Sequence, residues 1–294
     1  MKGWYKVMRE NERNHQIHEA EDEKFLPLYS AMSGVGQELL SDIYCYTNQI
    51  VNVVFVGDPE TTSDWIMIDT GMPGSYQRLR QVAIDRFGEN NPPQAIILTH
   101  GHFDHVGAVV DLVKEWGVSV YAHEAELPYL TGRESYPDPD GTVEGGLVAK
   151  MSPIFPNEPI NLGTHIKPLP RDGTIPHMSE WRWVHTPGHA PGHISLFRES
   201  DRTLIAGDVF VNVKQESLYK VLTQKREING PPRYLTTDWV AAKRSVEKVA
   251  ALKPSVAVAG HGHPVMGEEL ADGLEKLVNE FDERAIPDYG KYLN

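Results

Sequence analysis

The sequence predicts an α/β fold in which β-sheets are covered by helices. Two observations lead to this prediction. Residues 94–123 show the pattern strand, helix, strand, which is that of a βαβ unit. In addition, both halves of the chain place strands before a helix, an order typical of a duplicated α/β layer structure. The length of 294 residues is enough for a large, well-buried core.

The first half contains three strand-like segments followed by the βαβ unit. The three segments are rich in β-branched and aromatic residues, which favours an antiparallel meander. They are IYCY (43–46), IVNVVFVG (50–57) and WIMIDTG (65–71). QAIILTH at 94–100 is a nearly continuous apolar run, typical of a strand buried on both faces. Apolar residues at helical spacing predict one helix over 104–117, and 118–123 is the next strand.

The second half starts with residues 131–176, which hold 8 of the 21 prolines. Such a stretch is typical of a lid or of a spacer, and the sequence favours neither. Strand patterns follow at 181–188, 193–199, 203–210 and 255–260. Helix patterns lie at 238–252 and 268–284. We predict an N-terminal extension over 1–42 that packs on the core, and a single domain over 43–294.

Composition and charge narrow the class of protein. With 28 Lys+Arg against 41 Asp+Glu, the net charge of −13 argues against a nucleic-acid partner. No apolar run approaches the ~20 residues that span a bilayer, and the first 25 residues are too polar for a signal peptide. We therefore expect a cytoplasmic protein with no membrane contact. Because Cys45 is the only cysteine, a metal site would have to use His, Asp and Glu.

The segment HGHFDH places three imidazoles and one carboxylate within six residues, directly after the buried strand. Side chains alternate along an extended chain, so His100 and His102 point the same way. Asp104 and His105 begin the predicted helix and turn toward the same space, while Gly101 removes a side chain where the backbone must bend. Imidazole and carboxylate suit Zn²⁺, and also Fe or Mn. The alternative is a His-rich turn that binds no metal.

HGHFDH resembles the HxHxDH signature of the metallo-β-lactamase superfamily. Four further segments resemble the remaining motifs of that family in the family's order. They are DTG (69–71), HTPGHAPGH (185–193), IAGDVF (205–210) and AGHGHP (259–264). The resemblance covers roughly residues 43–270. It implies a four-layer αβ/βα sandwich, in which two mixed β-sheets are flanked by helices and the site lies at one edge between the sheets.

The resemblance also implies a ligand set for two divalent metal ions, with Zn expected first and Mn or Fe as alternatives. One ion would be held by His100, His102 and His189. The other would be held by Asp104, His105 and His261. Asp208 would bridge the two ions, which would share a metal-bridging hydroxide. Asp104 would also be catalytic, orienting the hydroxide and passing a proton to the leaving group. Asp69, His185 and His193 are expected to support the ligands.

The family likeness predicts a metal-dependent hydrolase that acts on a small molecule with an ester-like bond: a lactone, a thioester or a phosphoester. The main alternative is a mononuclear iron oxygenase of the persulfide dioxygenase type, and a non-catalytic metal-binding module is a third reading. Only 33 residues follow His261. We therefore expect a glyoxalase II-like core without the helical domain that holds glutathione.

Two segments could form the substrate pocket, 131–176 and 211–237. The second carries Arg226 and Tyr234, which would suit an anionic group. A solvated helix face and a proline-rich turn would explain the same residues. The sequence also leaves open whether the chain forms a homo-oligomer.

Overall fold

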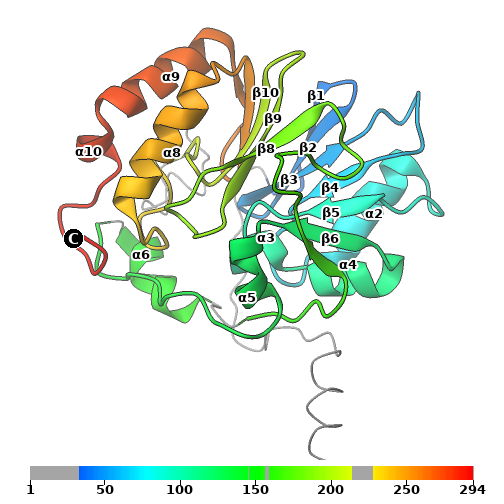
Figure 1. Cartoon of the computed structure of the whole chain (residues 1–294), viewed down its shortest axis with the longest axis horizontal. Coiled ribbons are helices and arrows are strands. Elements are labelled where there is room, and N and C mark those ends of the chain that lie inside the picture. Colours follow the sequence, from blue (N-terminus) through cyan, green and yellow to red (C-terminus); the bar gives the residue numbers. More distant parts are fainter. Residues whose placement is uncertain (1–32, 145, 156–158, 214–227, 294) are drawn as a thin grey trace, which may run out of the picture.

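The computed structural model describes residues 33–293, apart from 145, 156–158 and 214–227. Two sheets pack face to face and helices cover their outer faces (Figure 1). The strands are β1 (Gly36–Leu40), β2 (Ile43–Asn48), β3 (Val51–Val56), β4 (Ile66–Ile68), β5 (Ala95–Ile97), β6 (Ser119–Ala122), β7 (Ile166–Pro168), β8 (Trp181–His185), β9 (Ile194–Arg198), β10 (Thr203–Gly207), β11 (Val256–Ala259) and β12 (Val265–Met266).

The described helices occupy the segments between these strands and after them. They are α2 (Tyr76–Phe87), α3 (Phe103–Val106), α4 (Val109–Trp116), α5 (Leu127–Leu130), α6 (Gly146–Met151), α8 (Trp239–Ala251), α9 (Gly267–Asn279) and α10 (Phe281–Arg284), with short 3₁₀ turns η1 (Glu124–Glu126) and η2 (Ser152–Ile154). None of them is long and apolar enough to cross a membrane.

Both sheets are mixed. The first has the order β1-β2-β3-β4-β5-β6-β7, antiparallel up to β4 and parallel from β4 to β7. The second has the order β12-β11-β10-β9-β8, with β10 and β11 parallel and the other pairs antiparallel. Because parallel neighbours need crossovers, helices are carried onto the sheet faces.

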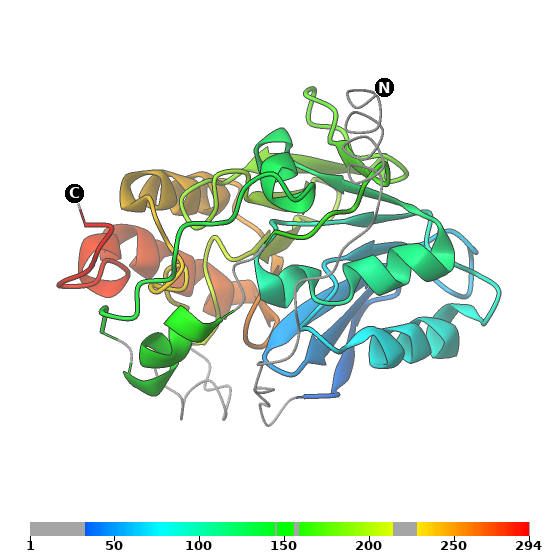
Figure 2. The same ribbon diagram turned by 90° about the horizontal axis from the view of Figure 1, so that it is seen from below.

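Three apolar clusters hold the layers together. Helices α2 and α4 bury Leu79 and Val113 against the outer face of the first sheet. Helices α8 and α9 bury Val246 and Leu274 against the outer face of the second. Between the sheets, apolar side chains from both meet, including those of Ile97, Leu196, Ile205 and Val258. Figures 1 and 2 show the resulting order helix, sheet, sheet, helix, which is the predicted four-layer αβ/βα sandwich.

The helix predicted over 104–117 is divided in two, which corrects that prediction. Helix α3 ends at Val106, and α4 begins at Val109. The chain leaves the helical conformation at Ala108, whose N–H donates to the Thr70 carbonyl. Gly107 lies directly against the same loop, since a Cβ on it would lie 2.1 Å from the carbonyl carbon of Met72. The Gly107 N–H donates to the Gly71 carbonyl at 2.8 Å. The helical spacing continues across this break, so the sequence pattern does not reveal it.

Three strands lie where the sequence indicated none: β1, β7 and the two-residue β12, which pairs with β11. Strand β1 pairs with β2 within the stretch predicted as an N-terminal extension, of which residues 1–32 lie outside the described part. Strand β7 lies within the proline-rich segment 131–176 and forms the other edge of the first sheet. An edge position tolerates Pro168, because the missing N–H is not needed by a further strand. At least part of that segment is therefore sheet.

Candidate metal centre

The histidine and aspartate motifs meet where strands of both sheets end. His100 comes shortly after β5, Asp208 directly follows β10 and His261 comes just after β11. His189 lies in the turn between β8 and β9, which belongs to the second sheet. Because carboxyl ends of neighbouring parallel strands share one sheet edge, residues distant in the sequence are brought together there.

The described residues contain three groups whose ligand atoms all lie within 4.8 Å of one another. The groups are His100, His102 and His189; Asp104, His105 and His261; and His100, His105 and Asp208. All seven side chains are buried. These are the seven residues that the sequence nominated as metal ligands, now found at one place.

Asp208 lies between the first two groups. Its Oδ2 is 3.4 Å from Nε2 of His189, in one group, and 3.3 Å from Nε2 of His261, in the other. The same oxygen is 3.6 Å from Nε2 of His105. One carboxylate oxygen thus faces imidazoles of both groups.

Several buried polar atoms of these residues have no hydrogen-bond partner in the described structure. They are His100 Nε2, Asp104 Oδ1, His105 Nε2 and Asp208 Oδ1. Leaving a buried polar atom unsatisfied costs about 1–3 kcal/mol, so four orphans in one cluster call for a partner. Nitrogen and carboxylate oxygen are the ligands that Zn²⁺, Fe and Mn accept. The donor set therefore fits divalent metal ions.

The three histidines of the first group have lowered pKa values and are therefore neutral at pH 7. Burial, reinforced by neighbouring imidazoles, holds the pKa values of His100 and His189 well below the usual histidine value. Burial likewise lowers the pKa of His102 to about 4, although Asp104 opposes the shift. His102 Nδ1 lies 2.9 Å from His189 Nε2. Neutral imidazole is the form that binds a metal, so this group requires little deprotonation.

In the second group, nearby carboxylates outweigh burial and raise the pKa values of the histidines. Burial alone would lower the pKa of His105, but the carboxylates of Asp69, Asp208 and Asp104 raise it well above the usual value. For His261 burial is again outweighed by Asp208 and Asp104, and the pKa rises to about 9. Burial would raise the pKa of Asp208, but His261 and His105 hold it well below the usual range. Without a metal, the protonated imidazoles of His105 and His261 balance the charge of the carboxylates of Asp104 and Asp208.

Contacts behind the ligands fix which ring nitrogen faces the cluster. His105 Nδ1 lies 2.8 Å from Asp69 Oδ2, His261 Nδ1 lies 2.9 Å from the Ile50 carbonyl, and His100 Nδ1 lies 3.0 Å from the Thr99 hydroxyl. With Nδ1 engaged, Nε2 is left to face the cluster. Asp69, which the family resemblance nominates as a support, thus contacts the back of His105.

His193 and His185 have different surroundings, although each lies four residues from His189. His193 Nε2 accepts a hydrogen bond from the Asp208 N–H at 2.8 Å, so it holds the backbone of a candidate ligand. His185 Nε2 lies 2.9 Å from the Pro191 carbonyl and its ring stacks on His123. These two contacts hold the His185 side chain against the turn and His123 rather than against the ligand side chains.

Sequence reasoning missed Glu126, which contacts the backbone of two ligand loops. Its carboxylate accepts hydrogen bonds from the N–H groups of Gly101 and Gly192. Nothing in the local sequence HEAELPYL separates Glu126 from Glu124, which is exposed at the surface. The distinction arises only when the turn after β6 meets the loops that carry His100 and His189.

Of the two residues predicted to bind the substrate, the structure describes only Tyr234. Arg226 lies outside the described residues. Tyr234 is buried in an apolar cluster that joins the proline-rich segment to the segment after Asp208, and its ring lies 5.9 Å from that of Phe155. Phe103, between two candidate ligands, packs against the same cluster. Both predicted pocket segments thus contact the loop that carries His102 and Asp104.

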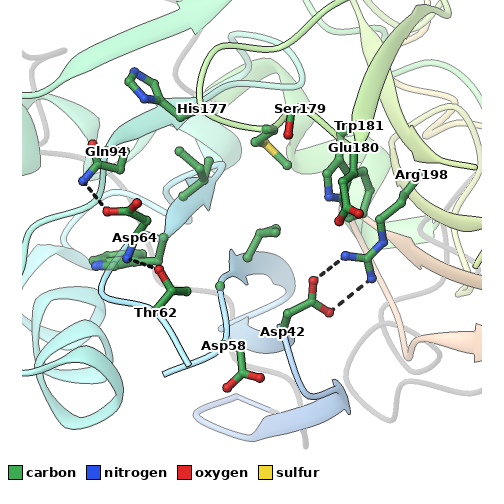
Figure 3. A pocket seen from close by; sticks show the side chains of 15 residues that line it. Asp42, Asp58, Thr62, Asp64, Gln94, His177, Ser179, Glu180, Trp181 and Arg198 are labelled. Atoms are coloured by element: carbon green, nitrogen blue, oxygen red, sulfur yellow. Dashed lines mark hydrogen bonds and ion pairs between the residues drawn. The ribbon is translucent and has the colours of Figure 1, made fainter. Parts of the chain in front are cut away.

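A separate pocket of about 330 Å³ lies at the opposite ends of the strands (Figure 3). Its lining includes Ile66 and Gln94, at the starts of β4 and β5, whereas the ligand loops follow the ends of those strands. Arg198 pairs there with Asp42 and with Asp201. This pocket is distinct from the metal-ligand cluster.

The model of the metallo-β-lactamase superfamily matches residues 46–261. A protein of Bacillus subtilis (strain 168) named probable metallo-hydrolase YflN is 45% identical over 255 residues, covering 87% of this chain and 97% of that protein. These two findings establish the class. The chain belongs to the metallo-β-lactamase superfamily, and the prediction of a metallohydrolase is confirmed at this level.

Solved structures agree on the fold. The di-iron-bound form of TTHA1623 has a TM-score of 0.52 and 26% identity, covering 79% of this chain and 94% of that chain. The B3 metallo-β-lactamase BLEG-1 has a TM-score of 0.51 and 23% identity, covering 78% and 91% of the two chains. The second likeness supports the fold alone, because its identity is low.

Proposed function

We propose that this protein is a dinuclear metal-dependent hydrolase that cleaves an ester-like bond in a small molecule: a lactone, a thioester or a phosphoester. The observation that carries the proposal is the place of Asp208. One of its oxygens lies 3.3–3.6 Å from imidazole nitrogens of both ligand groups, as expected of a bridging carboxylate. A centre for a single ion would need only one of the two ligand groups that flank Asp208.

The residues divide into three roles. His100, His102 and His189 would hold one ion, Asp104, His105 and His261 the other, and Asp208 both. When bound, a pair of divalent ions lowers the pKa of a shared water to about 7 and stabilises charge that develops on the substrate. Zn is the expected metal, with Mn and Fe as alternatives. The similar structure of TTHA1623 in a di-iron-bound form supports a pair of ions and is one reason to test iron.

Asp104 would hold and move the proton. Its Oδ2 lies 3.3 Å from His261 Nε2, whereas its Oδ1 has no hydrogen-bond partner among the described residues. Burial would raise the pKa of Asp104, but His105 and His261 lower it, so the carboxylate is ionised at neutral pH and can accept a hydrogen bond. We assign Oδ1 to orienting the attacking water and to passing a proton to the leaving group.

For the substrate we keep Arg226 as the proposed contact for an anionic group, and Tyr234 as its companion. The buried position of Tyr234 beside Phe155 supports a role in shaping an apolar wall. Arg226→Ala should raise KM for an anionic substrate and leave KM for a neutral one unchanged. Equal KM values in variant and parent would remove Arg226 from the proposal.

The test joins metal content to activity. Purified protein should contain about two Zn, Mn or Fe ions per chain. In a panel of a lactone, a thioester, a phosphodiester and a cephalosporin, at least one should be hydrolysed, and chelation should abolish the activity until metal is restored. A matched control is His177→Asn, an exposed histidine of the distant pocket, which should keep both metals. One Fe per chain together with oxygen consumption on glutathione persulfide would overturn the proposal.

A further inference from the structure

Glu126 is a fully buried acidic residue outside the metal-ligand set. It ends the 3₁₀ turn η1, which follows strand β6 of the first sheet. A carboxylate is rarely buried unless hydrogen bonds compensate for the lost water. Here three donors do so: two backbone N–H groups and the hydroxyl of Tyr136. Such a concentration of donors calls for a function of this side chain.

The two oxygens of Glu126 are divided between two loops. Oε2 accepts from the Gly101 N–H at 2.9 Å, and Oε1 accepts from the Gly192 N–H at 2.7 Å. Gly101 lies between His100 and His102, in the half of the chain that forms the first sheet. Gly192 lies in the turn between β8 and β9, three residues after His189. One side chain therefore ties together the two loops that build a single ligand group.

The Gly192 loop approaches Glu126, and the Gly101 loop approaches Tyr136, so closely that a larger residue would displace them. A Cβ at Gly192 would lie 2.7 Å from Cγ and 2.8 Å from Oε1 of Glu126. A Cβ at Gly101 would lie 2.7 Å from the Tyr136 hydroxyl. Gly101 does not have a positive φ, so the close approach explains this glycine better than a special backbone bend does. The glycines and Glu126 thus form one packed unit.

Tyr136 completes this unit. Its hydroxyl donates to Glu126 Oε2 and accepts from the Gly101 N–H at 2.9 Å. Its ring lies 4.5 Å from the ring of His102 and stacks on Tyr129 at 3.9 Å. Tyr136 therefore fills the space beside His102, while Glu126 holds the backbone of the Gly101 and Gly192 loops.

We propose that Glu126 is a positioning residue that keeps His189 in register with His100 and His102, and so sets the metal affinity of that group alone. The inference rests on the proposed function. The second group is held by other contacts, from Asp69 to His105 and from the Ile50 carbonyl to His261. Losing the Glu126 bridge should therefore affect one ion and spare the other.

The main test is Glu126→Gln, which keeps the shape of the side chain. An amide has only one acceptor oxygen, so its NH₂ group must face one of the two backbone N–H groups. Metal-free protein reloaded with Zn²⁺ and followed by titration calorimetry should show one site weakened about 10–100-fold and the other unchanged, as is typical when a contact behind a ligand is lost. Glu124→Gln, two residues earlier and exposed, is the matched control and should bind both ions normally.

Two further variants keep the test decisive if Glu126→Gln folds poorly. Gly192→Ala adds a Cβ against Glu126 and should weaken the same site. Tyr136→Phe removes only the hydroxyl and leaves both backbone bonds to Glu126, so it should change the affinity less than Glu126→Gln does. The melting temperature of the metal-free protein, measured alongside, separates loss of metal affinity from loss of stability.

The outcomes distinguish this inference from the proposed function. His102→Ala should abolish one of the two sites. If His102→Ala leaves both sites intact, the proposed ligand set is wrong. If His102→Ala abolishes one site while Glu126→Gln and Gly192→Ala bind both ions as tightly as the parent, only the positioning role is refuted. Equal weakening of both sites would also refute it, because that result indicates a general structural role.

Discussion

Asp69 Oδ2 lies 2.8 Å from His105 Nδ1, and the same oxygen accepts the Thr99 hydroxyl at 2.8 Å. The other oxygen, Oδ1, accepts the Thr99 N–H at 2.8 Å. Asp69 itself has a φ of 60°, in the left-handed region that is uncommon for residues other than glycine and that Asp tolerates better than most. This backbone conformation accompanies the placement of a carboxylate at the back of a candidate ligand.

Asp69→Asn should weaken metal binding at the group of Asp104, His105 and His261. The amide can keep the Thr99 N–H on its oxygen, but its NH₂ group then faces His105 and selects the wrong ring tautomer. We expect an affinity loss of about 10–100-fold at that group, measured by metal titration, and a smaller loss at the other group, because the Thr99 hydroxyl that Asp69 accepts also contacts His100. Asp172→Asn is a matched control, since Asp172 accepts the N–H and hydroxyl of Thr174 at an exposed turn. A variant that binds both ions like the parent would contradict this role of Asp69.

Asp208→Asn should weaken both groups strongly, whereas Asp69→Asn acts mainly on one. An amide carries no charge to balance two cations, and only one of its two polar atoms is an acceptor. We expect metal content to fall below one ion per chain, and hydrolysis to fall by more than ~100-fold, beyond the range of a supporting residue. Elemental analysis and initial rates on the substrate found in the hydrolysis panel measure both effects. Retention of two tightly bound ions would show that Asp208 does not bridge.

Metal binding should release protons from one group only. In the metal-free protein, the pKa of His261 is about 9 and that of His105 is raised well above its usual value, so both rings are protonated at pH 7. Each must lose a proton before its Nε2 can bind a metal. His100, His102 and His189 have lowered pKa values and are already neutral. We therefore expect the side chains to release about two protons at pH 7, both from the second group, and the shared water of the metal pair to add up to one more.

The sign of the pH dependence follows from this. Protons compete for His105 and His261 below their raised pKa values, so affinity at the second group should rise with pH from 7 to 9. Affinity at the first group should stay constant across that window. Calorimetric titrations in two buffers with different ionisation enthalpies count the protons, and His261→Ala should release about one fewer. Equal proton release at the two groups would contradict the assignment.

The candidate ligand residues could be nominated in two ways. HGHFDH places four residues of ligand type in one strand-to-helix turn, whereas His189, Asp208 and His261 are nominated only because their segments resemble motifs of the superfamily. Glu126 could not be predicted in this way. Its partners Gly101 and Gly192 lie 25 and 66 residues away, and only tertiary packing brings them to it.

The same limit explains the errors in the fold. At the break after Gly107, the N–H groups of Gly107 and Ala108 donate to the carbonyls of Gly71 and Thr70, contacts that the helical pattern of the local sequence does not contain. Strand β1 has largely exposed residues, so it lacks the alternation that indicates a half-buried strand. The predictions that were confirmed rest on local periodicity and on short motifs that resemble those of a family, whereas those that failed depend on contacts between distant segments.

Asn52 holds the His261 loop against the first sheet. Its side-chain amide donates to the carbonyls of Ala259 at 2.9 Å and Gly262 at 2.7 Å, and its oxygen accepts the Thr47 hydroxyl at 2.9 Å. Its backbone N–H donates to the Gly260 carbonyl at 2.7 Å. Asn52 is buried, so truncation would leave the partner groups unsatisfied.

Asn52→Ala should therefore lower the free energy of unfolding of the metal-free protein by about 2–4 kcal/mol, from two or more orphaned buried groups. Urea denaturation measures this value. Asn91→Ala is the control: its amide also donates to two backbone carbonyls, Ser63 and Phe87, but at a partly exposed turn where water can replace it. We expect that control to cost less than ~1 kcal/mol. Because the Ala259–Gly262 loop carries His261, Asn52→Ala should also weaken metal binding at the second group, and equal stability of the two variants would refute the role of Asn52.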